Sequence, residues 1–425
     1  MNPGGRRREN PVILSPSASF RAGSAKNPFL TLRGIGEFGA INRIAAAFGG
    51  RETTRRGGRG SRLLAGIGDD AAVFRLDGDK GTGEAESGKK EGAGTPYDLL
   101  VSTDLLVEGI HFNLSYAGLN DLGYKALQAN LSDIAAMGGE PLFYLVSIAA
   151  PGNMDAGEFK RIFAGMDEAA RESGIKLAGG DTSGTPGPLF INISITGRVE
   201  RGRAVMRSGA MPGDEIWVTG TLGDSAAGLE ILKTGASKNQ KYLVSRHLRP
   251  KARVKAGRLL GKAGIATAMI DVSDGISSDL MHVLYASGAG AVIYEDRLPF
   301  SEELIAYAGR ERAVELALTG GEDYELLFMT SGQGAAGERQ RKIPCHSRPG
   351  FVHTVAGSSG NPAVSKDVQS SRGKQSTERL LSAFGRRAGV AFTKVGDVLE
   401  AGSVYIESAG GRRRTLEARG YEHFG

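Results

Sequence analysis

Apolar and polar residues along the first half of the chain follow two periods, one typical of strands and one typical of helices. Alternation with a period of two predicts strands, whereas apolar residues three or four positions apart predict helices. The expected elements are a helix over residues 37–48, strands over 63–66, 71–75 and 98–102, a helix over 119–137, a strand over 142–148, a helix over 156–173, and strands over 175–178 and 189–199. This order predicts a mixed α/β domain.

A second α/β unit is expected after the turn Pro212-Gly213-Asp214, which precedes another apolar strand. The elements expected beyond residues 220–223 are helices over 225–232, 253–263, 277–286 and 301–307 and strands over 268–271, 290–294 and 325–329. Because single cores rarely grow beyond about 250–300 residues, a chain of 425 residues is long enough for two domains. We expect their limits at residues 34–205 and 206–425.

Three segments of low complexity interrupt this pattern. Residues 1–33 are rich in Arg, Ser and Gly, residues 77–96 join two expected strands, and residues 332–377 contain few apolar side chains. None of them has enough apolar surface to bury, so we expect a disordered basic leader and two disordered or mobile insertions.

Positive charge is concentrated near the N-terminus. The whole chain has a formal net charge of +6, whereas residues 1–62 contain twelve Lys or Arg and three Glu, a net of +9. The remainder is slightly acidic, because 6 − 9 = −3. A basic leader of this kind either attracts polyanions or is a solvated tail. We do not expect nucleic acid to be a partner.

The sequence lacks the signals of membrane or secreted proteins. No run approaches the roughly 20 apolar residues of a membrane-spanning helix, and residues 1–33 have no apolar stretch followed by a small-residue cleavage site. The single cysteine, Cys345, excludes an internal disulfide and a cysteine-built zinc site. We therefore expect a cytoplasmic protein that does not bind membranes.

Aspartates follow the apolar, strand-like runs repeatedly. They are Asp69 and Asp70, Asp104, Asp181, and Asp271 with Asp274, and Asp133 lies near the end of the helix expected over 119–137. Carboxylates gathered at strand ends raise one another's pKa unless a cation neutralises them. Sets of oxygen ligands suit Mg²⁺, which usually bridges to substrate phosphates. The pattern predicts a metal-dependent enzyme that handles phosphate.

Each acidic motif also has a simpler interpretation. The pair in GIGDDAAVF is either a metal ligand set or a solvated turn, and Thr103 or Asp104 is either a ligand or a helix cap. His111 either meets an anionic substrate or is an ordinary histidine, and Asp133 alone would be an unremarkable acid at a helix end. Their number, rather than any one of them, favours the metal site.

Glycines next to two of these acids indicate where phosphate would approach the backbone. Gly179 and Gly180 precede Asp181, and the segment DVSDG places Ser273 and Asp274 before a helix whose N-terminus could hold phosphate. The segment GEAESGKK over 83–90 is close to a P-loop, but no apolar strand precedes it and Lys90 stands in place of the hydroxyl residue. We interpret it as coincidence.

Nine longer motifs follow one another along the chain. They are GIGDDAAVF, VSTDLLVEGIHF, YKALQANLSDIAAMGGEP, GGDTSG, RSGAMPGDEIWVTGTLGDSAAGLEIL, HLRPKAR, IDVSDGISSDL, LTGGEDYELLF and the terminal GYEHF. In this order they resemble the motifs of the thiamine-monophosphate kinase family. The resemblance runs from about Gly36 to the C-terminus and is interrupted by residues 77–96 and 332–377.

This resemblance implies an α/β (α+β) fold of two domains, like that of aminoimidazole ribonucleotide synthetase. N-terminal strands would form a barrel across a homodimer interface, and ATP would lie in a cleft lined by the N-terminal domain with several Mg²⁺ ions. The positions that match metal ligands are Asp70, Ser102, Thr103, Asp104, Asp133, Asp181, Asp271 and Asp274. Those that match ATP contacts are Gly180, Asp181, Arg207 and Ser273, and those that match thiamine monophosphate contacts are His111, Glu322 and Tyr421.

The implied reaction is a direct, in-line phosphoryl transfer that Mg²⁺ assists. The attacking phosphate oxygen of thiamine monophosphate is already ionised, so no general base is expected. The alternatives are another phosphate-activating enzyme of the same superfamily, such as one like aminoimidazole ribonucleotide synthetase, and a non-catalytic scaffold whose basic leader binds nucleic acid. Relatives that use a reactive cysteine are disfavoured, because the only cysteine lies in an insertion.

Overall fold

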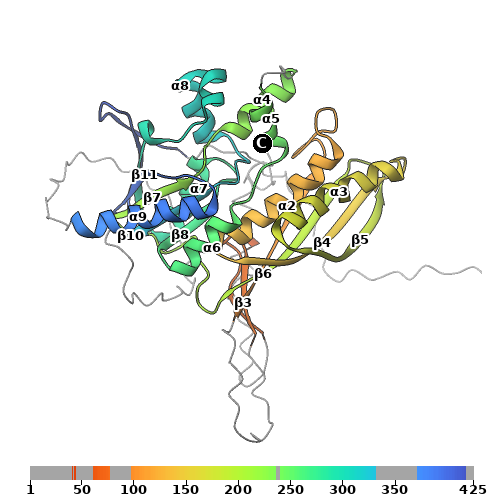
Figure 1. Cartoon of the computed structure of the whole chain (residues 1–425), viewed down its shortest axis with the longest axis horizontal. Helices are drawn as coiled ribbons and strands as arrows, with labels where there is room; N and C mark the ends of the chain where they lie inside the picture. Colours follow the sequence, from red (N-terminus) through yellow and green to blue (C-terminus); the bar gives the residue numbers. More distant parts are fainter. Residues whose placement is uncertain are drawn as a thin grey trace, which may run out of the picture. The chain divides into compact units, whose positions relative to one another are not determined.

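The computed structural model describes residues 41, 43–44, 61–76, 97–235, 240–331 and 371–417 (Figure 1). The leader over 1–33, most of the helix expected over 37–48, the insertion over 77–96, residues 332–370 and Tyr421 lie outside them. The described chain forms two β-sheets with helices packed on them, which confirms the expected α/β class. Within this part of the chain, no helix has the length and apolarity needed to cross a membrane.

The first sheet has six strands and carries part of the acidic motifs. Its order is β1 (Ser61–Ala65), β2 (Ala72–Leu76), β3 (Tyr97–Val107), β6 (Phe190–Glu200), β4 (Glu140–Pro151) and β5 (Lys176–Thr185). All neighbours are antiparallel except β4 and β5. Side chains alternate between the two faces, so Ile191, Ile193 and Ile195 of β6 are buried on one of them.

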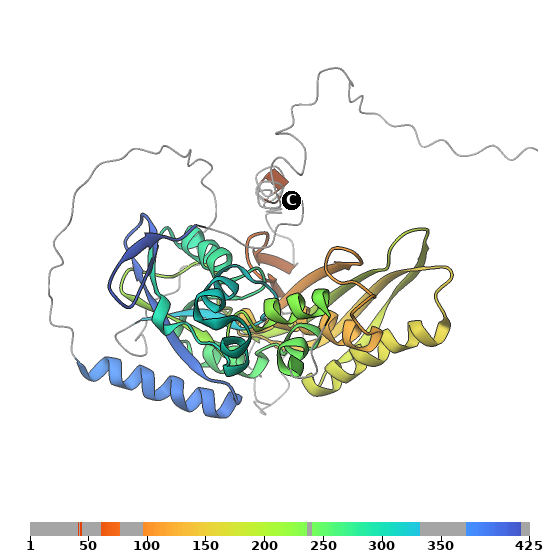
Figure 2. The same cartoon turned by 90° about the horizontal axis from the view of Figure 1, so that it is seen from above.

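Two long helices, α2 (Leu119–Ala136) and α3 (Ala156–Ser173), pack on that buried face and on each other (Figures 1 and 2). They approach closely because glycines face the neighbouring backbone. A Cβ on Gly123 would lie 1.9 Å from the carbonyl oxygen of Ile162, and one on Gly165 would lie 1.8 Å from that of Asn120. Fourteen of the 18 residues of α2 are buried, so this helix is held on most of its sides.

The opposite face of the six-stranded sheet carries no helix among the described residues. Val101 and Leu105 of β3 and Phe143 and Leu145 of β4 project from it with 36–51% of their surface exposed. These four positions alternate with buried ones along their strands, as expected for a sheet with one packed and one open face.

The second sheet has seven strands. Its order is β13 (Arg413–Thr415), β12 (Val404–Glu407), β9 (Gly290–Tyr294), β11 (Phe392–Leu399), β7 (Asp214–Thr219), β10 (Leu326–Ser331) and β8 (Ala266–Asp271). Only β9 and β12 are parallel. The surrounding helices are α4 (Asp224–Thr234), α5 (Lys241–Leu248), α6 (Val254–Ala263), α7 (Ile276–Ser287), the short η4 (Glu295–Arg297), α8 (Glu302–Thr319) and α9 (Ser371–Ala388).

Apolar residues occupy both faces of the central strands of this sheet. Ile216 and Val218 of β7 pack in a core with α7 and α8, whereas Trp217 between them packs in another core with α6 and α9. The end of α2 joins this second core through Ala135 and Ala136. Helix α2 therefore links the two sheets, which matters for the site.

The structure differs from the sequence prediction in several elements. Helix α8 continues to Thr319 across a kink at Gly309, where φ is +69°, instead of ending near residue 307. Strand β5 runs through Gly179, Gly180 and Asp181 rather than ending before them. Helix α9 begins at Ser371, inside the segment 332–377 that we expected to lack structure. Helix α5 and strands β11 to β13 are additional elements.

Candidate active site

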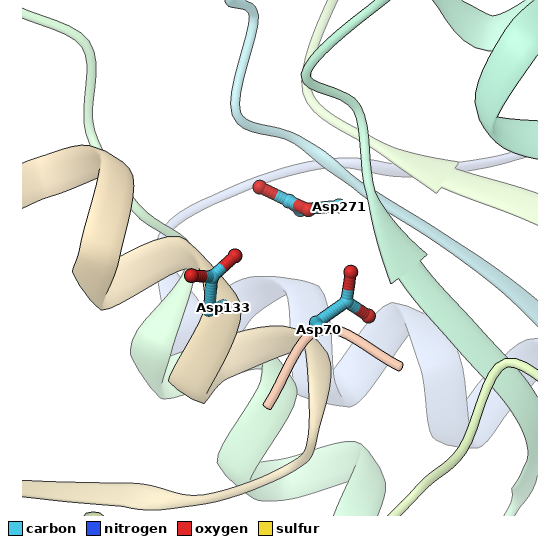
Figure 3. Close-up of side chains that lie close together, drawn as sticks. All are labelled: Asp70, Asp133 and Asp271. Atoms are coloured by element: carbon cyan, nitrogen blue, oxygen red, sulfur yellow. The ribbon is translucent and has the colours of Figure 1, made fainter. Parts of the chain in front are cut away.

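Three predicted aspartates from distant parts of the sequence meet in space. Asp70 lies in the turn before β2, Asp133 in the last turn of α2, and Asp271 at the end of β8. One carboxylate oxygen from each lies within 4.8 Å of the others. Figure 3 shows the three carboxylates directed toward a common space from a loop, a helix and a strand. The structure thus brings together three of the acids that the sequence predicts as metal ligands.

Like charges and burial oppose ionisation of Asp271, Asp133 and the neighbouring Asp104. Burial, followed by the charge of Asp70, raises the pKa of Asp271 to about 8. The same two causes raise the pKa of Asp104, on β3, to about 6. Burial, and then the charges of Asp104 and Asp271, raise the pKa of Asp133 well above its usual range. Because the charge of Asp70 acts on Asp104 and that of Asp104 acts on Asp133, Asp104 lies near the trio, and we call these four residues the acidic cluster.

The described donors and cations offset only part of the negative charge of these carboxylates. Nη2 of Arg207 donates to Oδ1 of Asp70 at 2.5 Å, and the backbone N–H of Arg207 donates to Asp69 at 2.7 Å. The Ser102 hydroxyl lies 2.5 Å from Oδ2 of Asp133 and 2.9 Å from the carbonyl oxygen of Asp70. Oδ2 of Asp70 is buried and has no hydrogen-bond partner among the described residues.

This donor set fits a divalent cation. Several carboxylates and one hydroxyl are hard oxygen ligands, the kind that Mg²⁺ accepts, and a buried carboxylate oxygen without a partner is costly until a cation or donor reaches it. Arg207 brings one positive charge to the cluster through its ion pair with Asp70, against four acids. Metal binding would thus supply the charge that the described chain lacks at this point.

Strand geometry directs the Thr103 side chain away from Asp133. The Thr103 side chain projects from the open face of the sheet, where its hydroxyl contacts Asn192, Ser194 and the carbonyl oxygen of Ile193. Adjacent residues of a strand face opposite sides, so Ser102 and Thr103 cannot both direct hydroxyls at Asp133. Their roles as ligands stay predictions.

Asp181 lies on the exposed edge strand β5, where its carboxylate accepts a hydrogen bond from the N–H of Thr182 at 2.9 Å. Gly180 precedes it, and a Cβ there would lie 1.8 Å from the carbonyl oxygen of Val146 on β4. Close strand pairing thus requires this glycine, whatever its relation to phosphate. The ATP contacts predicted for both residues stay predictions.

The loop after β8 is held by an acid that we did not predict. Oδ2 of Asp279, on α7, accepts hydrogen bonds from the backbone N–H groups of Ser273, Asp274 and Gly275 at 3.1–3.2 Å. These N–H groups belong to the loop before α7, which begins at Ile276, so the phosphate site expected at the N-terminus of that helix stays a prediction. The signal in the sequence is the Asp four residues after the glycine of DVSDGISSD, a spacing of about one helical turn.

His111 and Glu322, the two described residues predicted to contact the substrate, are electrostatic neighbours. Burial would raise the pKa of Glu322, but the charge of Lys125, its hydrogen bond to Glu322 and the nearby His111 lower it below its ordinary value, so the carboxylate stays ionised. Nδ1 of His111 accepts a hydrogen bond from the N–H of Val107 at 3.0 Å. The third predicted residue, Tyr421, lies outside the described residues.

The loop that carries Glu322 also borders the acidic cluster. Burial, followed by the charges of Glu322, Asp104 and Asp271, raises the pKa of Tyr324 well above its usual range. Asp323, between them, accepts hydrogen bonds from the N–H groups that begin α4 and so acts as a cap. Tyr324 had no place among the predicted site residues, because nothing in its local pattern reveals this proximity.

The sequence of this chain is similar to two family models and to individual known proteins. Family models described as "AIR synthase related protein, N-terminal domain" and "AIR synthase related protein, C-terminal domain" match residues 68–199 and 211–337. The thiamine-monophosphate kinase of Bacillus subtilis is 40% identical over 278 residues, which cover 64% of this chain and 79% of that protein. The one from Escherichia coli K12 is 43% identical over 276 residues, covering 64% and 78%.

A solved structure gives the same picture in three dimensions. The structure of AaThiL complexed with AMPPCP and TMP is similar to this chain with a TM-score of 0.67 and 28% identity. The match covers 93% of this chain and 99% of that one. The two-domain fold expected from the sequence is therefore confirmed, because both family models and a nearly complete structural match support it.

Proposed function

This chain belongs to the thiamine-monophosphate kinase family, and from that premise we propose that it transfers the γ-phosphoryl group of ATP to thiamine monophosphate, forming thiamine diphosphate and ADP. The observation that carries the proposal is the acidic cluster of Asp70, Asp104, Asp133 and Asp271, in which the raised pKa values of the last three call for cations. The related structure with AMPPCP, an ATP analogue, and TMP supports ATP as the co-substrate.

Mg²⁺ is the cofactor that the cluster fits. When bound, it would offset the repulsion between two polyanions and stabilise charge on the transferred phosphoryl group. Asp70, Asp104, Asp133 and Asp271 would hold it, and Ser102 would orient Asp133 through their hydrogen bond. Ser102 itself, Thr103, Asp181 and Asp274 complete the proposed metal ligands.

The remaining residues are assigned by the substrate that each would meet. Arg207 would turn from Asp70 toward the phosphates of ATP, and Gly180, Asp181 and Ser273 would line the nucleotide. His111, Glu322 and Tyr421 would contact thiamine monophosphate. No residue is proposed as a general base, since the attacking phosphate oxygen is ionised at neutral pH, and positioning is the main task of the protein.

We also propose that the protein is a homodimer that buries the open face of the six-stranded sheet. Val101, Leu105, Phe143 and Leu145 give this face the apolar character that a second copy would cover. A barrel formed by N-terminal strands across the interface is the expected arrangement.

We also propose domain limits of 34–205 and 206–425. The cytoplasmic location stays a prediction.

The direct test is a coupled assay of the purified full chain with thiamine monophosphate, ATP and Mg²⁺. The expected result is formation of thiamine diphosphate and ADP that requires Mg²⁺, stops with EDTA, and does not occur with thiamine as acceptor. Absence of turnover with either acceptor would reject the proposal and favour another phosphate-activating enzyme of the superfamily or a scaffold.

A matched pair of variants tests the metal cluster itself. Asp133→Asn is expected to lower turnover by about a hundredfold or more, because a bound metal ion contributes several kcal/mol of transition-state stabilisation. Asp167→Asn is the control, since that carboxylate lies on α3 and is 66% exposed. Equal turnover by both variants would remove Asp133 from the metal site.

A further inference from the structure

Two buried side chains lie beside Glu322, whose carboxylate is proposed to contact the substrate. Neither of them has a part in the function described so far. Lys125 of α2 is 3% exposed and His247 of α5 is 2% exposed. Nζ of Lys125 lies 2.8 Å from Oε1 of Glu322 and 3.4 Å from Nε2 of His247. The three residues come from the motifs YKAL, HLRP and GGED, which lie far apart in the sequence.

The contacts of His247 assign a role to each of its ring nitrogens. Burial, followed by the charge of Lys125, lowers the pKa of His247 to about 3, so the ring is neutral. An ammonium group can only donate hydrogen bonds, so Nε2 must be the acceptor and Nδ1 carries the proton. Nδ1 lies 3.1 Å from the hydroxyl of Ser225 and 3.4 Å from Oε2 of Glu322. The two oxygens of Glu322 thus face Lys125 and His247, respectively.

The backbone of this loop is also constrained. Glu322 has φ of +66° and Tyr324 has φ of +51°, conformations that residues other than glycine rarely adopt. Their N–H groups donate to the carbonyl oxygens of Ser273 and Val272 at 2.7 and 2.9 Å. Strain of this kind persists where surrounding contacts fix the chain, and it is frequent at binding sites.

Glu322 differs from both partners in its exposure. Its side chain is 27% exposed, whereas Lys125 and His247 are almost completely buried. The buried pair therefore holds the carboxylate from one side and leaves part of it accessible from another. A carboxylate in this state is suited to a ligand that is cationic or rich in N–H donors, as thiamine is with its thiazolium ring and aminopyrimidine.

We propose that Lys125 and His247 are positioning residues that hold the Glu322 carboxylate ionised and oriented toward the heterocycles of thiamine monophosphate. The inference rests on the proposed function and extends it to two residues that would act through Glu322 rather than by contact with the substrate. It assigns the motifs YKAL and HLRP to substrate recognition rather than to packing alone. Recognition of ATP should be unaffected, because Lys125 contacts Glu322 and not the acidic cluster.

A double-mutant cycle in the full chain tests this role. Lys125→Met, Glu322→Gln and the double variant are compared by their steady-state KM for thiamine monophosphate and for ATP. Lys125→Met is expected to raise KM for thiamine monophosphate about tenfold or more, with KM for ATP changed by less than about twofold. In the Glu322→Gln background, the same substitution should have no further effect, because its action passes through Glu322. Lys160→Met, an exposed lysine on α3, is the control.

Each outcome decides the proposal. Additive effects of Lys125→Met and Glu322→Gln, or a similar loss of affinity for ATP, would overturn it in favour of a structural role. If Lys125→Met does not fold, the comparison of Glu322→Gln with the double variant decides, because the double variant has no unpaired buried charge at these positions. Equal KM values for thiamine monophosphate in these two variants support the proposal. A double variant that also fails to fold overturns it.

Wild-type turnover distinguishes failure of the proposed function from failure of this inference. Wild-type turnover of thiamine monophosphate is measured first on the same preparation. Its absence would refute both the function and this inference, whereas normal wild-type turnover with additive substitutions would refute the inference alone.

Discussion

Replacing Asp104 by Asn is expected to stabilise the metal-free protein at alkaline pH while it abolishes turnover. Burial, followed by the charge of Asp70, raises the pKa of Asp104 from its ordinary value of 3.8 to about 6. The folded protein thus keeps a proton that the unfolded chain releases between these two values. Wild-type stability must therefore fall as pH rises through this window, and asparagine, which cannot ionise, avoids the loss.

The magnitude follows from the size of the shift. A difference of 6 − 3.8, or about 2.2, corresponds to at most about 3 kcal/mol at 1.36 kcal/mol for each pKa unit. The full difference between variant and wild type is expected above about pH 7, and almost none of it below about pH 4, where Asp104 is protonated in both states.

The assay is urea unfolding in EDTA at about pH 4 and about pH 8, with Asp167→Asn as a control for an exposed carboxylate. Mg²⁺ should then reverse the order at about pH 8, because it stabilises the wild type in proportion to its binding and the variant much less. A difference in stability that is the same at both pH values would refute the electrostatic reasoning. So would stabilisation of both proteins by Mg²⁺ to the same extent.

Three further predictions concern single contacts. Arg207→Lys should raise KM for ATP about tenfold, because lysine lacks the planar fork of arginine, and an unchanged KM would remove Arg207 from the ATP site. Asp279→Ala should lower the free energy of unfolding by about 3 kcal/mol through three unpaired N–H groups, whereas Asp279→Asn, which keeps an acceptor oxygen, should lower it less. Gly123→Ala should cost about 1–3 kcal/mol, because its Cβ meets backbone at 1.9 Å. Gly152→Ala, with nothing within 4 Å, is its control, and equal midpoints in urea would contradict the close packing of α2 and α3.

Elements with strong local periodicity were predictable from the sequence. The helix expected over 156–173 and the strand expected over 290–294 have those bounds in the structure, because capping residues and apolar spacing mark their ends. Asp155, for example, accepts hydrogen bonds from the first N–H groups of α3, and Gly174 ends that helix with φ of +70°. Helix α5 has only eight residues, and β13 has three exposed residues, so neither has a periodic signal of its own.

Some features of the candidate site could likewise be predicted from the sequence, and others could not. Asp70, Asp133 and Asp271 could be predicted as a group, because acids that end successive elements are brought together when those elements pack. The contact of Lys125 with Glu322 joins residues 197 positions apart, and no local pattern reveals such a pair. Alternation along β3 separates Thr103 from Ser102, a consequence of strand geometry that the motif alone does not express.

Helix α2 also acts as a ruler between the two ends of the proposed substrate. Lys125, beside the carboxylate assigned to the heterocycle, and Asp133, in the acidic cluster, are eight residues apart, which corresponds to about 12 Å along the axis at 1.5 Å for each residue. Because the helix is buried on most sides, this length cannot adjust to a different acceptor. Thiamine would then stop short of the acids and thiamine diphosphate would extend past them, so the chain would select its acceptor by length as well as by chemistry.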